Sequence, residues 1–353
     1  MPKQPVDDAF NPGIHRMLAD GVHYRDIKDI QAGIQDWSEW GRAWTDAATR
    51  YEEIAEKALA RGRTLTAGEA LARASLYCHY ALGPLYFDPE QRKVIQKRKE
   101  DLFKRAAPWL APPLQRREIP FEQVSLPAYL RLPATGARRH PCAVLVGGLD
   151  TTKEDYLQFN NLCAQRGLAT LAFDGPGQGE MFYRMKWRAD FEKAVFAVLD
   201  FLEERTDIEA SRIGVIGRST GAHYVCKAAA MDRRIKACVA WGAMYHVRNL
   251  PTMPSVIREG FMFVSGSSTV PEASKFFESI NLDGVVQNIK CPLLVVHGGK
   301  DVITPTENAT LTVQHAGGPT ELLFYEDSMH CCHDRAHIVR PAMADFLAEQ
   351  LLA

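Results

Sequence analysis

The stretch Ile213-Gly-Val-Ile-Gly217-Arg-Ser219-Thr-Gly221-Ala-His223 decides the fold of this chain. Its apolar first part is typical of a strand covered on both faces, and the small residues from Ala222 to Ala230 favour a helix beyond it. Between them lies Gly-x-Ser-x-Gly, a turn tight enough to need a glycine on each side of the serine. The same five residues also occur by chance as an ordinary turn. The flanking strand and helix favour the catalytic interpretation, in which Ser219 is a nucleophile.

Length and composition set the frame for this motif. The chain has 353 residues, of which 46% are hydrophobic and 24% charged, so it can bury a large core and a second unit. The net charge is -1 and no long basic run is present, so the sequence predicts no nucleic-acid partner and no membrane partner. Small molecules remain the expected ligands. Residues 1–8 lack the charged-then-apolar pattern of a signal peptide, and no apolar run approaches the length of a membrane span, so we expect a cytoplasmic protein.

The N-terminal third is predicted to be helical. Tryptophans and other apolar residues recur every three or four positions from Asp36 to about Arg61, which indicates one long amphipathic helix with an aromatic stripe. Thr66-Ala-Gly-Glu69 is a capping-box pattern that would open the next helix, and Gly83-Pro84 would end it. Asp88-Pro89 starts a third helix, and the break at Ala111-Pro112-Pro113 marks the end of this region.

Beyond that break, strands and helices alternate. A hairpin of edge strands is expected over 121–132, followed by short apolar strands at 143–146, 169–173, 213–217, 237–241, 293–297 and 321–324. Helix-length segments separate these strands, which predicts an α/β protein with a doubly wound, mostly parallel sheet. Ligand chemistry on such a sheet belongs at the carboxyl ends of the strands.

Two of those strand ends carry the groups that a serine nucleophile needs. Asp301 follows the strand at 293–297 and precedes a helix that Thr304 and Glu307 are expected to cap, although it could also be an ordinary turn aspartate. His330 follows the last strand and is preferred over His333, which is expected to open the final helix. The chain order Ser, Asp, His is the one that hydrolases built on this type of sheet use.

The backbone around the serine would supply the remaining chemistry. The first N–H groups of a helix are unpaired and partly positive, so the Thr220 N–H is a predicted oxyanion donor. A second donor is expected from Leu149, or its neighbour Gly148, in the glycine-rich loop after the strand at 143–146. The chain has eight cysteines, none of which pairs with another at metal-ligand spacing, so we expect reduced thiols, no metal and no cofactor.

Several motifs together resemble one family, that of the 2,6-dihydroxypseudooxynicotine hydrolase-like and fermentation-respiration switch protein-like α/β-hydrolases. The matching stretches in the second part of the chain are Gly147–Glu154, Phe173–Glu180, Gly217–Gly221 and His330–His333, and those in the helical part are Trp37–Trp44, Thr66–Glu69 and Ala106–Pro108. The resemblance therefore spans nearly the whole chain.

The resemblance implies an α/β-hydrolase fold at 113–353, a helical cap or lid domain at 1–112 over the active site, and homodimers. It also implies hydrolysis of a C–C bond beside a ketone, with Ser219, Asp301 and His330 at the positions of the family's triad. The segment after Trp241-Gly242 departs from the family pattern. That cap segment, about 243–285, is where we expect substrate contacts, and the candidates are Tyr245, His246, Arg248 and Glu259.

Three functions stay open at this point. In the first, Ser219 attacks a ketone, such as a β-diketone or an acyl-aryl ketone, and an acyl-enzyme forms as a carbanion leaves. In the second, the leaving group is an alkoxide or an amine, and the protein is a carboxylesterase or amidase. In the third, the chain is a regulatory or binding protein that does not use its hydrolase fold. The presence of all three triad residues and two glycine-rich loops favours an enzyme.

Overall fold

A computed structural model describes residues 7–83 and 85–353 of the chain. The chain divides into two compact units, Met1–Arg116 and Arg117–Ala353. The stretch 1–6, most of the segment tested above for a signal pattern, and Pro84 of the predicted Gly83-Pro84 helix stop lie outside the described residues. Within the described part, no helix has the length and apolar composition needed to cross a membrane.

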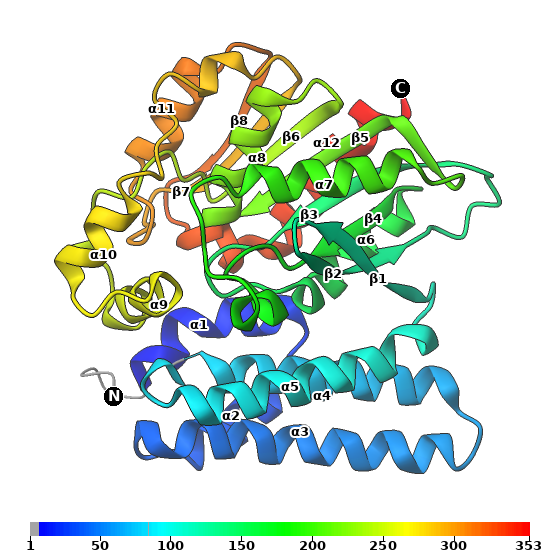
Figure 1. The fold of residues 1–353 in the computed structure, drawn as a ribbon. Helices are drawn as coiled ribbons and strands as arrows, with labels where there is room; N and C mark the ends of the chain where they lie inside the picture. Colours follow the sequence, from blue (N-terminus) through cyan, green and yellow to red (C-terminus); the bar gives the residue numbers. More distant parts are fainter. Residues whose placement is uncertain (1–6, 84) are drawn as a thin grey trace. The chain divides into compact units, whose positions relative to one another are not determined.

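The first unit consists of helices (Figure 1). Their bounds are α1 Asp7–Asp20, α2 Tyr24–Ala32, α3 Trp37–Leu59, α4 Thr64–Leu82 and α5 Pro89–Ala106. The predicted aromatic stripe lies on α3 and is buried against α4: the rings of Trp44 and Tyr80 lie 5.3 Å apart, and the Trp40 indole N–H donates to the Tyr80 carbonyl at 2.8 Å. Packing within the unit therefore accounts for this stripe.

The helix starts in this unit show which capping signals act. The Asp88 carboxylate accepts the Gln91 N–H at 3.0 Å, so it caps α5 as expected. The capping box predicted at Thr66 is wrong, because α4 already begins at Thr64 and no side chain caps it. Nothing between Gly62, which has φ +68°, and Thr66 interrupts a helix, so α4 extends back to that turn.

The second unit is built on one eight-stranded sheet with the order β1-β2-β4-β3-β5-β6-β7-β8. The strands are β1 Leu114–Phe121, β2 Val124–Arg131, β3 His140–Val146, β4 Ala169–Phe173, β5 Ile208–Arg218, β6 Ile235–Trp241, β7 Leu293–Gly298 and β8 Thr320–Tyr325. β2 runs antiparallel to β4, and the strands from β4 to β8 are mutually parallel. The carboxyl ends of β3, β5, β6, β7 and β8 therefore meet at one edge.

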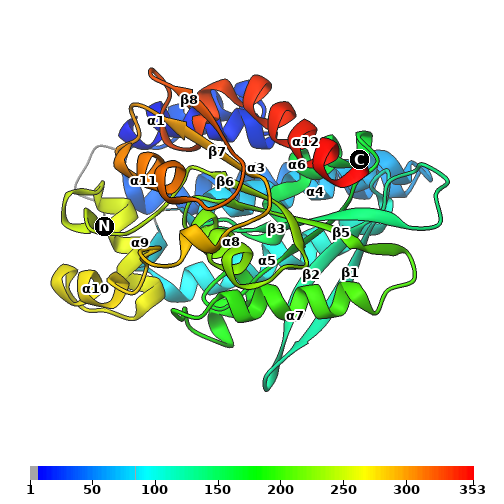
Figure 2. The same cartoon turned by 90° about the horizontal axis from the view of Figure 1, so that it is seen from above.

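Helices cover both faces of this sheet (Figure 2). They are α6 Leu157–Gln165, α7 Glu192–Glu203, α8 Thr220–Met231, α11 Glu307–His315 and α12 Ala336–Leu352, with α9 Ser255–Ser265 and α10 Val270–Phe277 inserted between β6 and β7. Successive strand residues point to opposite faces, so Val144 packs in the core with α7 and α8, whereas Leu145 packs in the core with α6 and α12. Burial on both faces explains why the strands are continuous apolar runs.

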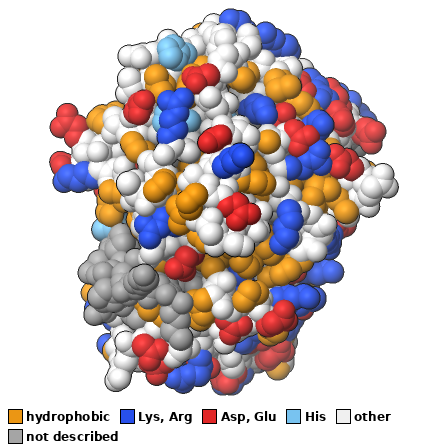
Figure 3. Space-filling model, turned by 60° about the vertical axis from the view of Figure 1, so that its left-hand side comes forward, with side chains coloured by type: hydrophobic (Ala, Val, Ile, Leu, Met, Phe, Trp, Pro, Cys, Tyr) orange, Lys and Arg blue, Asp and Glu red, His pale blue; other side chains and the backbone are white. Residues whose placement is uncertain are grey.

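The charged side chains follow the balanced composition. On the face drawn in Figure 3, Lys and Arg side chains are interspersed with Asp and Glu side chains, and apolar side chains lie between them. Mixed charges of this kind produce no large field of one sign over that face.

Candidate active site

Ser219 lies at the turn between β5 and α8, in a backbone conformation that a non-glycine residue seldom adopts. Its φ is +60° and its ψ is -121°, a strain of about 1–3 kcal/mol that persists only where the surroundings enforce it. The flanking glycines allow the close approach: a Cβ on Gly217 would lie 2.0 Å from the Gly221 carbonyl oxygen, and one on Gly221 would lie 2.4 Å from that of Val146. The turn thus holds the Ser219 hydroxyl at the carboxyl edge of the sheet.

Three side chains from three strand ends form a hydrogen-bonded row there. His330 Nε2 lies 2.9 Å from Ser219 Oγ, and His330 Nδ1 lies 2.6 Å from Asp301 Oδ2. The Asp301 side chain is fully buried. The three residues that the sequence pattern selected are therefore brought together with a base beside a hydroxyl and a carboxylate beside the base.

The Asp301 carboxylate is held by its own loop. Oδ1 accepts the N–H groups of Ile303 at 2.9 Å and Thr304 at 2.8 Å, and Oδ2 accepts the Thr304 hydroxyl at 2.6 Å. The expected cap of the next helix by Thr304 is wrong, because α11 begins only at Glu307 and the Thr304 hydroxyl is used by Asp301 instead. In turn, His297 Nε2 lies 2.9 Å from the Thr304 carbonyl oxygen, so this buried histidine supports the loop.

These contacts set the charges of the row. Burial raises the pKa of Asp301, but the neighbouring His330 and the hydrogen bonds from Thr304 outweigh burial and lower that pKa to about 2. Burial lowers the pKa of His330, but the Asp301 carboxylate outweighs it, so that pKa lies well above its ordinary value of 6.5. The row therefore favours a negative carboxylate and a strongly basic imidazole.

His333 has a different environment from His330. The His333 ring lies 5.6 Å from the ring of Trp241. His333 belongs to the 3-10 segment His330–Arg335, and α12 begins only at Ala336. His333 thus precedes the last helix by a short turn instead of opening it.

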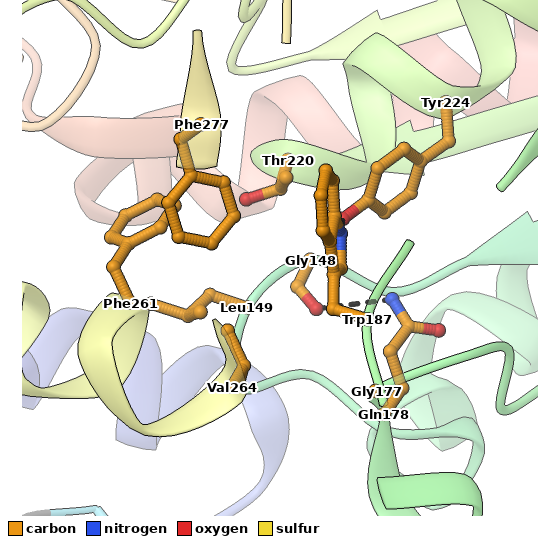
Figure 4. A pocket seen from close by; sticks show the side chains of 10 residues that line it. All are labelled: Gly148, Leu149, Gly177, Gln178, Trp187, Thr220, Tyr224, Phe261, Val264 and Phe277. Carbon is orange, nitrogen blue, oxygen red and sulfur yellow. Dashed lines mark hydrogen bonds between the residues drawn. The ribbon is translucent and has the colours of Figure 1, made fainter. Parts of the chain in front are cut away.

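A pocket lies beside the serine turn, and its wall is mostly aromatic and aliphatic (Figure 4). Its lining residues are Gly148, Leu149, Gly177, Gln178, Trp187, Thr220, Tyr224, Phe261, Val264 and Phe277. The Trp187 indole N–H donates to the Tyr224 hydroxyl oxygen, so the polar group of Trp187 is paired within the pocket wall. The Thr220 hydroxyl is buried and has no hydrogen-bond partner among the described residues.

The comparisons with known proteins agree with this geometry. The model of the family described as "Esterase FrsA-like" matches residues 25–318. The chain belongs to the FrsA-like esterase family. It is 36% identical over 351 residues to "2,6-dihydropseudooxynicotine hydrolase" of Paenarthrobacter nicotinovorans, covering 99% of this chain and 94% of that protein. It is also 37% identical over 246 residues to "Hydrolase ORFZ" of Pyricularia oryzae, covering 64% of this chain and 58% of that protein.

A solved structure supports the same assignment. The crystal structure of 2,6-dihydroxy-pseudo-oxynicotine hydrolase superposes with a TM-score of 0.90 at 35% identity, covering 96% of each chain. This FrsA-like chain therefore has the α/β-hydrolase fold with an N-terminal helical region, and it is a hydrolase.

The loop that carries the predicted oxyanion donor Leu149 lies against the serine turn of this FrsA-like protein. A Cβ on Gly148 would lie 2.6 Å from the Arg218 carbonyl oxygen, 3.1 Å from Ser219 Cβ and 3.4 Å from the Thr220 nitrogen, so the loop passes directly against the turn. Leu149 follows in that loop and lines the pocket together with Thr220.

The four predicted substrate contacts lie elsewhere in the described structure, outside the residues that line this pocket. The Tyr245 N–H donates to Asn308 Oδ1 at 2.8 Å, and the Tyr245 side chain is buried. His246 is buried as well, and Arg248 is exposed and lies 3.4 Å from an Asp283 carboxylate oxygen. Glu259 lies on α9, where burial raises its pKa. The role of these four stays a prediction.

Sequence reasoning expected substrate contacts in the cap segment, about 243–285, but it did not single out the members of that segment that line this pocket, Phe261, Val264 and Phe277, and it missed Trp187 and Tyr224. Trp187 lies between β4 and α7 and Phe277 ends α10, and neither belongs to a periodic pattern that points to a site. Tyr224 lies on α8 just after the nucleophile motif, where its helical position relative to Thr220 was a usable signal.

A buried ionic cluster ties together the two glycine-rich loops. Lys153 Nζ lies 2.6 Å from Glu154, 2.7 Å from Asp174 and 2.8 Å from Glu180, so one ammonium pairs with three carboxylates. Burial raises the pKa of Asp174 despite the lysine. The three carboxylates are spaced closely enough for a metal ion, but the Lys153 ammonium lies among them. The cluster thus joins the loop after β3 to the loop after β4.

Proposed function

We propose that this hydrolase cleaves a C–C bond beside a ketone through an acyl-enzyme, with Ser219 as nucleophile, His330 as base and Asp301 as the carboxylate that orients the base. The observation that carries the proposal is the row in which His330 lies 2.9 Å from Ser219 Oγ and 2.6 Å from Asp301 Oδ2. The choice of a C–C bond rests on the relative from Paenarthrobacter nicotinovorans, whose similarity covers 99% of this chain.

In the first half of the reaction, Ser219 Oγ attacks the carbonyl carbon while His330 Nε2 takes the hydroxyl proton. The carbonyl oxygen becomes an oxyanion, which the N–H groups of Leu149 and Thr220 stabilise. When the tetrahedral intermediate collapses, the C–C bond breaks and its electron pair stays on the departing carbon. The imidazolium proton of His330 is then transferred to that carbon, which leaves an acyl-Ser219 ester.

In the second half, water replaces the departed group. His330 removes a proton from the water, the oxygen adds to the acyl carbon, and the second tetrahedral intermediate expels Ser219 Oγ, which recovers its proton from His330. The products are a carboxylic acid and the protonated carbon fragment. Asp301 stays ionised throughout and stabilises the imidazolium form of His330.

The chemistry limits the substrate class. A carbanion leaves only if its charge is delocalised, so the substrate should be a β-dicarbonyl or an acyl group on an electron-poor or polyhydroxylated ring. The pocket suits the flat members of this class, because Trp187, Tyr224 and Phe277 give it an aromatic wall. The unpartnered Thr220 hydroxyl would bind one polar substituent of the substrate.

An ester or amide substrate is the second candidate. The family description names an esterase, and the same three side chains serve an alkoxide or amine leaving group equally well. A non-catalytic binding role is a weaker third candidate, because a strained serine at φ +60° is costly to keep where no chemistry uses it.

A substrate panel distinguishes these candidates. Purified protein would be incubated with 1,3-diketones, acylated polyhydroxyphenyl ketones and matched p-nitrophenyl and alkyl esters, and the acid and ketone products would be identified by mass. We expect C–C cleavage of at least one ketone. If esters react with a kcat/KM some orders of magnitude higher and no ketone is cleaved, the esterase function replaces this proposal. No turnover of any member would favour the binding role.

The role of the helical unit as a cap rests on the resemblance, as does the homodimer. If the helical unit helps to form the substrate site, deleting residues up to about Leu110 should abolish activity and leave a core prone to aggregation. A truncated protein that stays monodisperse and fully active would exclude the cap role.

The mass of the intact protein in solution, measured by light scattering, would test the homodimer.

A further inference from the structure

Gln178 lies in the glycine-rich loop after β4 and joins that loop to the loop after β3. Its side-chain nitrogen donates to the Gly147 carbonyl at 2.5 Å and to the Gly148 carbonyl at 3.1 Å. Figure 4 draws the bond to Gly148 as a dashed line. Its side-chain oxygen accepts the Gly175 N–H at 3.1 Å. The residue is buried, so these bonds are made away from bulk water.

An amide is well matched to these three partners. Two carbonyl oxygens need a donor with two hydrogens on one atom, and the Gly175 N–H needs an acceptor, which a glutamine side chain supplies together. With the amide turned the other way, its oxygen would face two carbonyl oxygens, so the network determines its orientation. A carboxylate in this place would repel both carbonyls.

These bonds bear on the oxyanion donor because of peptide geometry. The carbonyl of Gly148 and the N–H of Leu149 belong to one planar trans peptide and point in opposite directions. Since Gln178 holds the Gly148 oxygen, the Leu149 N–H is directed away from Gln178. Gly148 itself lies against the Ser219 turn, because a Cβ on Gly148 would lie 3.1 Å from Ser219 Cβ.

We propose that Gln178 is a positioning residue for the oxyanion site: its amide fixes the Gly148–Leu149 peptide so that the Leu149 N–H is already aimed at the reacting carbonyl oxygen. This inference rests on the proposed function, since it assumes an oxyanion formed by attack of Ser219. It adds a residue that touches neither the nucleophile nor the base and acts through the backbone that it holds.

The loop that carries Gln178 is itself held in place. Gly179 has φ +41°, and a Cβ there would lie 2.1 Å from Asp174 Oδ2, so the backbone packs directly on that carboxylate. Asp174 Oδ2 also accepts the Glu180 N–H at 3.1 Å and lies 2.7 Å from Lys153 Nζ. Gln178 therefore extends from a rigid support, as a positioning role requires.

The test compares Gln178→Glu and Gln178→Met with the parent. Loss of one oxyanion donor costs about 10²–10³ in kcat, and we expect a fall of about a hundredfold in both variants with little change in KM. A trifluoromethyl ketone, which adds reversibly to Ser219 and forms an oxyanion, should bind about a hundredfold more weakly. A non-reactive substrate analogue should bind as before. Gln165→Glu, on the exposed end of α6, is the control for the added charge and should match the parent.

The pH dependence separates positioning from a general loss of structure. A protonated carboxyl can donate one hydrogen bond to a carbonyl, so the rate of Gln178→Glu relative to the parent should rise as pH falls, whereas that of Gln178→Met should stay constant. Unchanged binding of the trifluoromethyl ketone, or failure of both variants to fold, would overturn the inference. Ser219→Ala should bind the ketone no better than a non-reactive analogue; equal tight binding there would instead contradict the proposed function.

Discussion

Replacing Ser219 by alanine is expected to lower kcat/KM by about three to six orders of magnitude, the range for loss of a triad member. The reason is that Ser219 Oγ, which lies 2.9 Å from His330 Nε2, is the atom proposed to form the acyl-enzyme. The fold should survive, because the change removes one oxygen and leaves Gly217 and Gly221 free to form the turn. The measurement is turnover of the best substrate in the panel, together with a thermal unfolding curve.

A matched serine provides the control. Ser211 is exposed on β5, with its hydroxyl 3.0 Å from Glu209, and Ser211→Ala should keep the parent activity. A fluorophosphonate should label the parent at Ser219 and leave Ser219→Ala unlabelled. If Ser219→Ala retains most of its activity, another group is the nucleophile and the proposed function is wrong.

The sheet was predictable from the sequence because its parallel strands are buried on both faces. Strand cores such as Val144 and Ile216 are apolar without alternation, so their positions stand out between glycine-rich loops. Strand starts were harder to predict: β5 begins at Ile208, before the predicted Ile213, through a polar and partly exposed segment. Backbone pairing can extend a strand where no apolar side chain is needed.

The polar row of the site was predictable for a related reason. Ser219, Asp301 and His330 each follow a strand core, and strand ends of a parallel sheet meet at one edge, so sequence position alone indicates proximity. The pocket wall was not predictable in this way. Trp187 and Phe277 reach the pocket from connections whose paths depend on tertiary packing. Gln178 lies in Phe173–Glu180, one of the stretches that resemble the family, but its hydrogen-bond partners depend on how the loops after β3 and β4 pack against each other.

Asp301→Asn should lower kcat/KM by about four orders of magnitude and change its pH dependence. An asparagine nitrogen facing His330 Nδ1 would favour the tautomer that carries its proton on Nε2, which cannot accept the Ser219 proton. Asp327 supplies the control. It lies in the loop before His330, and its exposed carboxylate is 2.9 Å from Lys300 Nζ, so Asp327→Asn should leave the rate unchanged.

The direction of the pH change follows from the charges around His330. The base is active when neutral, so kcat/KM of the parent should rise with pH through a midpoint above 6.5, because the Asp301 carboxylate raises the pKa of His330 above that ordinary value. In Asp301→Asn the carboxylate is gone while burial, which lowers the same pKa, remains. The residual activity should therefore show a midpoint at lower pH than the parent. A profile measured from about pH 5 to 10 with an unchanged or higher midpoint would mean that Asp301 does not control the charge of His330.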